Sequence, residues 1–133
     1  MRQRVSMRRD QNDTGRDLIA MHEMSLAEGV LQIIEDAARQ QGFSRVKTVW
    51  LEVGQLACVE REALCFSFEQ AAKESIADSA RLEIIEVAGQ GWCSHCGCHV
   101  ALPALYEPCP GCGNYQVRVT DGDQLRVREL EVE

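Results

Sequence analysis

The stretch GQGWCSHCGCHVALPALYEPCPGCG, from Gly89 to Gly113, decides the organisation of this 133-residue chain. It holds five of the seven cysteines, all three prolines and two of the three histidines. The chain as a whole has ordinary globular composition, with 45% hydrophobic and 26% charged residues. So sharp a local change in composition predicts a small subdomain inserted into a larger one.

Four of these cysteines have the spacing of a metal site. Cys93 and Cys96 form one C-x2-C pair, Cys109 and Cys112 form another, and twelve residues separate the pairs. Two residues between cysteines let both sulfurs of a tight turn face one ion, and a glycine after each pair permits the turn. The pattern predicts structural zinc in a zinc-ribbon subdomain. Rubredoxin-like iron is the chemical alternative. A redox role is disfavoured because no thioredoxin-like pattern surrounds the pairs.

The remaining cysteines and the nearby histidines have weaker signals. His95, Cys98 and His99 are potential ligands, either as substitutes in the zinc site or in a second site. We favour the interpretation that they are exposed neighbours of the cysteine turns. Cys58 and Cys65 are expected to be small core residues. Because four thiolates fill a tetrahedron, no position remains for a reactive water, which argues against a metal-dependent hydrolase.

Hydropathy patterns outside this stretch predict two helices and three strands. The sequence SLAE, which starts at Ser25, has the capping-box form and should begin a helix that stops at Gly42. A second helical stripe begins at Leu64. Strands are expected over residues 45–54, 80–87 and 124–132.

Two of the expected strands have irregular alternation. Ile84 and Ile85 are consecutive apolar residues, which indicates a bulge or a strand buried on both faces. The apolar phase also slips between Val127 and Leu130.

These elements predict an α+β fold with two helices on a small three-stranded sheet. Residues 21–88 and 119–133 should form this domain, and residues 89–118 the inserted zinc ribbon. Residues 1–20 contain five arginines and three aspartates with almost no apolar periodicity. We expect them to be an extension outside the fold, either disordered or upstream of a true start at Met21.

Charge excludes two classes of partner. A formal net charge of −7 argues against nucleic acid and anionic membranes. Residues 89–113 contain no lysine or arginine, so the ribbon lacks the charges that bind phosphates. No apolar stretch reaches the roughly 18 to 20 residues of a membrane helix, and no apolar signal-peptide core follows the basic N-terminus. A cytoplasmic protein is expected.

His22 and Glu23 lie side by side just before the first expected helix, within MHEMS. On these residues alone, a solvated helix end is favoured over a metal site. The order of motifs changes this balance. Residues 21–133 resemble the HypA/HybF family of hydrogenase nickel-insertion proteins in the order of their motifs. These are MHEMS, an amphipathic helix, a strand ending in VG, then CVE, a helix, a strand, the paired cysteine turns and a final strand.

The resemblance implies a nickel metallochaperone that is not an enzyme. Such a protein would help to insert Ni(II) into the large subunit of a [NiFe] hydrogenase, together with a nickel-binding GTPase. His22 is implied as a nickel ligand, with Glu23 beside it and Glu60, in VGQLACVERE, as a further carboxylate. An exposed acid at a helix N-terminus is an equal interpretation of Glu60. The alternative function is a zinc-ribbon adaptor that binds proteins and has no nickel role.

Overall fold

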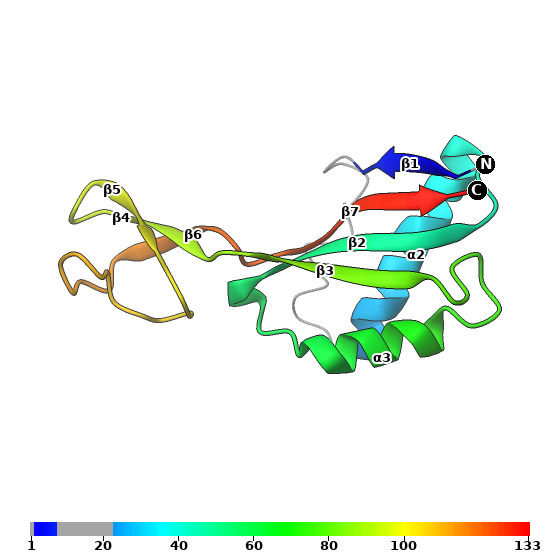
Figure 1. Cartoon of the computed structure of the whole chain (residues 1–133). Coiled ribbons are helices and arrows are strands. Elements are labelled where there is room, and N and C mark those ends of the chain that lie inside the picture. The colour runs from blue at the N-terminus through cyan, green and yellow to red at the C-terminus, as the bar shows by residue number, and fades with distance from the viewer. Residues whose placement is uncertain (1, 8–22) are drawn as a thin grey trace.

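The computed structural model describes residues 2–7 and 23–133, which form two lobes (Figure 1). The larger lobe contains a four-stranded sheet in the order β1-β7-β2-β3, and the smaller lobe a three-stranded sheet in the order β5-β4-β6. Both chain termini lie at the end of the larger lobe that is far from the smaller one (Figure 1). The chain passes between the lobes twice, after β3 and after β6.

The elements follow the expected order. The larger lobe contains β1 (Gln3–Ser6), α2 (Glu23–Gln41), β2 (Val46–Gly54), the short 3-10 helix η2 (Gln55–Ala57), α3 (Arg61–Ala71), β3 (Arg81–Val87) and β7 (Leu125–Val132). The smaller lobe contains β4 (Gln90–Cys93), β5 (Cys98–Ala101) and β6 (Val117–Asp121). The predicted α+β class is confirmed, with two long helices beside the sheet and the cysteine-rich lobe before the last strand.

The core of the larger lobe lies between the helices and one face of the sheet. Strand β2 pairs in parallel with β3, and helix α3 lies between these two strands in the sequence. On its other side β2 pairs antiparallel with β7. The face of β2 with Val49 and Leu51 is buried, while Trp50 and Glu52 on the other face are half-buried. Leu26, Val30, Ile34, Leu64 and Phe68 of the helices complete this core. Each fully buried side chain of this size stabilises the fold by roughly 1.5–3 kcal/mol.

A bulge in β7 explains the slipped apolar phase. Trp50 pairs with Glu129 and Leu51 pairs with Val127, which leaves Arg128 as an extra residue. The bulge lets Val127 and Leu130 both reach the core although they are three residues apart. Strand β3 instead keeps a continuous register with β2. Its Ile84 and Ile85 are both half-buried, one on each face.

The N-terminus differs most from expectation. Residues 1–20 were expected to lie outside the fold, but Gln3–Ser6 forms β1, which pairs antiparallel with β7 and adds a fourth strand to the sheet. Val5 and Met7 are buried there. A four-residue strand needs little apolar sequence of its own when a neighbouring strand supplies the hydrogen-bonding partners. Residues 8–22 lie outside the described part of the chain.

Two further boundaries in the structure differ from those expected from the sequence. Helix α2 begins at Glu23, so Ser25 lies in its first turn and is not its N-cap. The predicted division between ribbon and α/β domain at residue 118 falls inside β6, which pairs with β4 as far as Asp121. Across residues 2–7 and 23–133, no helix has the length and hydrophobicity needed to cross a bilayer.

Candidate metal sites

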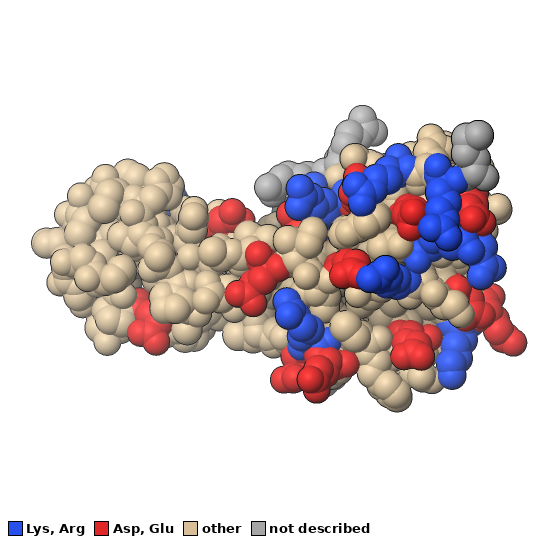
Figure 2. Space-filling model, in the orientation of Figure 1, with Lys and Arg blue, Asp and Glu red and all other residues tan. Residues whose placement is uncertain are grey.

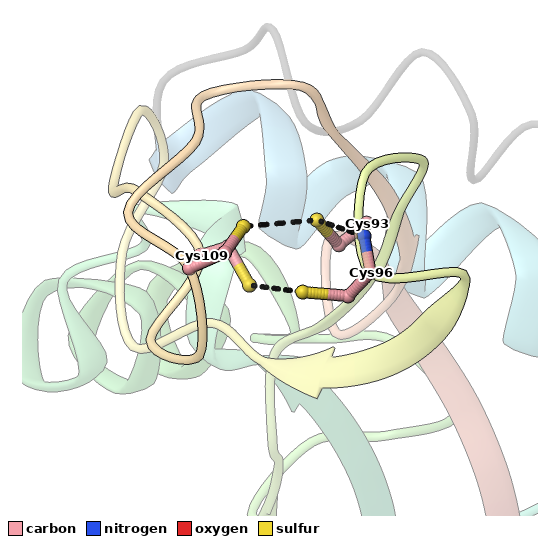
Figure 3. A group of neighbouring side chains, drawn as sticks. Cys93, Cys96 and Cys109 are labelled. Carbon is pink, nitrogen blue, oxygen red and sulfur yellow. Dashed lines mark hydrogen bonds between the residues drawn. The ribbon is translucent and has the colours of Figure 1, made fainter.

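The smaller lobe brings the four predicted cysteines together. The Sγ atoms of Cys93, Cys96, Cys109 and Cys112 all lie within 4.8 Å of one another. The Cys93 and Cys112 sulfurs are 3.7 Å apart, and the Cys96 and Cys109 sulfurs 3.8 Å. Side chains from both turns point into one space (Figure 3). A Zn–S bond of about 2.3 Å in a tetrahedron separates its sulfurs by about 3.8 Å, so the donor set fits zinc.

Local backbone geometry aims these sulfurs. Gly97 and Gly113 adopt φ values of +66° and +76°, and their amides donate to the carbonyls of Cys93 and Cys109 at 2.8 Å. Each turn therefore closes with a left-handed glycine, as the sequence predicted. Additional amides face the sulfurs, because the Cys96 N–H donates to Cys93 Sγ and the Gly111 N–H donates to Cys109 Sγ, both at 3.4 Å.

The pKa values of these thiols indicate how a bound cation would change their protonation. Burial raises the pKa of Cys109, but N–H groups of Cys112 and Gly111 donate to its sulfur and bring the pKa to about 7. The pKa of Cys96 is raised, first by its hydrogen bond with Cys112. Without a cation the cluster therefore favours a mixture of thiol and thiolate. Zn²⁺ would stabilise four thiolates at once and leave no coordination position for water.

Among the described residues, the other cysteines and histidines lie outside this cluster. His95, Cys98 and His99 are exposed, as favoured from the sequence, and His99 packs edge-on against Trp92 with ring centroids 5.0 Å apart. Cys65 is half-buried, and burial raises its pKa. The prediction that Cys58 is a core residue is wrong. Cys58 ends η2 in a left-handed conformation that leaves its side chain exposed.

The second predicted site lies where α2 and α3 begin. Glu23 is the first residue of α2 and Glu60 is the N-cap of α3. The Glu60 backbone N–H donates to Glu23 Oε1 at 3.4 Å, although the two residues are 37 positions apart. The structure therefore brings two of the three predicted nickel residues together. His22 lies outside the described residues.

Sequence reasoning missed Gln55, which links the two lobes beside this second site. Its Oε1 accepts a hydrogen bond from the Gly89 N–H at 2.9 Å, and the N–H of the next residue, Leu56, donates to the Gly122 carbonyl at 2.7 Å. Both segments that join the lobes are thus held against η2, the turn that precedes Glu60. A single glutamine in a short 3-10 helix has no sequence signal that would reveal this contact.

The fold and the cysteine cluster together define a small metal-binding protein in which a zinc-ribbon lobe extends from an α/β lobe. Residues 21–132 match the sequence model of the family described as "Hydrogenase/urease nickel incorporation, metallochaperone, hypA". The chain belongs to this HypA family.

Curated relatives and solved structures agree with this assignment. A hydrogenase maturation factor HypA from Azotobacter chroococcum is 55% identical over 113 residues, which cover 85% of this chain and 100% of that protein. The Albidiferax ferrireducens protein of the same name has the same identity and coverage. The solution structure of the Ni metallochaperone HypA from Helicobacter pylori shares the fold, with a TM-score of 0.67 at 24% identity over 84% of this chain and 97% of that one.

Proposed function

We propose that this protein carries Ni(II) and helps to insert it into the large subunit of a [NiFe] hydrogenase in the cytoplasm, acting with a nickel-binding GTPase and performing no catalysis itself. Nickel is its cargo and zinc its structural metal. Family membership supports the class of function. The names of the relatives, which are hydrogenase maturation factors, favour hydrogenase as the recipient.

The contact between Glu23 and Glu60 is the observation that carries the nickel site. It brings the backbone of Glu60, just before α3, within hydrogen-bonding distance of the Glu23 carboxylate at the start of α2, and His22 directly precedes Glu23 in the sequence. In the proposed site His22 supplies an imidazole nitrogen, Glu23 lies next to it, and Glu60 adds a carboxylate. Nitrogen donors suit Ni(II), whereas the four sulfurs suit zinc, so ligand type keeps the two metals apart. A site with few fixed ligands also releases its ion easily, which a delivery protein requires.

A calorimetric nickel titration of the zinc-loaded chain tests the proposal. We expect about one equivalent to bind the wild type. His22→Ala should weaken binding by more than about 100-fold, because even losing a partner outside the coordination sphere costs about 10–100-fold. Glu60→Gln should weaken binding by about 10-fold, since it keeps the hydrogen-bonding backbone and removes only the charge.

His95→Ala is the matched control, because it removes an exposed histidine from the other lobe. It should bind nickel as the wild type does. If His22→Ala and the wild type bind nickel alike, the nickel role of His22 is wrong and a zinc-ribbon adaptor becomes the better description.

A further inference from the structure

The outer edge of β7 is covered by a segment that lies outside the family match. Residues 3–6 pair with residues 129–132 of β7, whereas the match to the family begins at residue 21. Without β1, strand β7 would be an edge strand with unpaired N–H and C=O groups. Such an edge readily accepts an extended peptide as an added strand.

One face of this edge selects positive charge. Arg2 lies 3.7 Å from a carboxylate oxygen of Glu131, and Arg4 lies 3.5 Å from one of Glu129. The Arg4 guanidinium also stacks over Trp50 at 4.2 Å from the ring centroid. Both arginine side chains are more than 60% exposed, so these ion pairs add little to the stability of the fold. They favour a basic strand over an acidic one, since an acidic strand would meet like charge here.

The other face of the edge selects apolar side chains and holds the end of the strand. Val5 and Met7 are only 8% and 3% exposed and join the core cluster. The Met7 N–H donates to the Arg128 carbonyl at 2.8 Å, and its carbonyl accepts from an Arg126 guanidinium nitrogen at 3.1 Å. The edge thus offers apolar recesses, backbone partners, two acidic side chains and an aromatic platform.

We propose that the β7 edge is a docking site for an extended basic peptide of a partner protein, in which arginine or lysine alternates with apolar residues. Residues 2–7 occupy the same site intramolecularly and compete with that peptide. Because residues 2–7 and β7 belong to the same chain, the internal strand competes without having to bind from solution. Partner binding therefore requires displacement of β1.

The test measures binding of a fluorescent peptide with the sequence of residues 2–7, RQRVSM, to the full chain by anisotropy. Val5→Asp puts a charge into the apolar recess and should release β1. This variant should bind the peptide at least about 10-fold more tightly than the wild type, in which the internal strand blocks most of the sites. Ala104→Asp adds the same charge at an exposed position in the other lobe and should behave as the wild type does.

A second opened variant keeps the proposal testable if Val5→Asp does not fold. Arg2→Glu with Arg4→Glu changes only exposed side chains, yet it sets acid against Glu129 and Glu131 and should also open the edge. Adding Glu129→Lys and Glu131→Lys to the Val5→Asp chain should abolish binding of the basic peptide.

The proposal is overturned if the peptide binds none of the variants, or if it binds the wild type and the opened variants equally. Binding that ignores the charges of Glu129 and Glu131 would place the peptide elsewhere and would also overturn it. A wild-type dimer that dissociates in Val5→Asp would show that the occupant is β1 of a second copy and not a foreign peptide.

Discussion

Two ion pairs of nearly equal length differ in burial, and burial determines how much each pair contributes to stability. Arg126 and Glu52 approach to 2.6 Å with side chains only 23% and 21% exposed, and Arg81 and Glu83 approach to 2.7 Å with 77% and 42% exposed. Water screens the second pair strongly and the first pair much less. Arg126 also donates to the Met7 carbonyl, so it links β7 with β2 and with the residue that follows β1.

We therefore expect Glu52→Gln to lower the free energy of unfolding by about 1–3 kcal/mol, because it leaves the half-buried Arg126 without its charged acceptor. Glu83→Gln should change this free energy by less than about 0.5 kcal/mol. Urea titrations followed by tryptophan fluorescence measure both changes. Equal effects of the two substitutions would contradict the role assigned to burial.

Single residues were predictable from sequence only where their chemistry is local. The four-cysteine cluster was predictable because the two cysteines of each pair lie within one turn, and turn geometry restricts their spacing. Glu52 and Arg126 are 74 positions apart, and neither carries a local signal. Cys58 was misplaced because hydropathy alone cannot distinguish a buried thiol from one at a left-handed turn.

At the scale of elements, glycines make the junction of the two lobes possible. A Cβ atom added to Gly54 would lie 2.1 Å from the Gly122 carbonyl oxygen, and one added to Gly89 would lie 2.2 Å from the Leu102 carbonyl oxygen. The backbone of β2 thus lies directly against the segment that follows β6, and the segment that follows β3 lies directly against the residue after β5. No side chain could occupy either position unless the backbone shifted.

Gly54→Ala should consequently lower the free energy of unfolding far more than Gly42→Ala does. Gly42 ends α2 at φ +78° with open space around it, so alanine there costs only the left-handed conformation, about 1–2 kcal/mol. Gly54 has an ordinary φ of −69°, so its cost is purely the clash with rigid backbone, which we expect to exceed about 3 kcal/mol. Thermal unfolding of both variants gives the comparison. A smaller loss for Gly54→Ala would mean that the junction can open.

The positions of elements were predicted well where an apolar period continued for two turns or more. Helix α2 was placed correctly, but its start was not, because SLAE matches a capping box that lies inside the first turn. The break at Ile84 and Ile85 and the slip at Val127 look alike in sequence. Only the pairing with β2 distinguishes a strand half-buried on both faces from a bulge.

At the scale of the whole molecule, the two lobes are held together by different forces. Among the residues that the structure describes, the core of the larger lobe contains nineteen buried side chains, most of them from α2, α3 and the sheet. Between residues 89 and 121 the buried apolar side chains are Cys93, Leu102 and Cys109, two of which are predicted zinc ligands. The face of this lobe in Figure 2 is almost without charge, in contrast to the larger lobe. So small an apolar core cannot order thirty residues without a metal.

Removing zinc should therefore unfold the smaller lobe and spare the larger one. In a Trp50→Phe chain, a chelator should shift the fluorescence of Trp92 toward that of exposed tryptophan, while the far-ultraviolet helical signal from α2 and α3 stays within about 10% of its starting value. Cys112→Ser should give the same fluorescence without chelator, and Cys98→Ser, which alters an exposed cysteine outside the cluster, should not. Because zinc binds thiolates and the pKa of Cys96 is raised, protons already compete for this sulfur at neutral pH, so the apparent zinc affinity should fall further as pH falls. Loss of helical signal together with the Trp92 change would show that the two lobes fold as one unit.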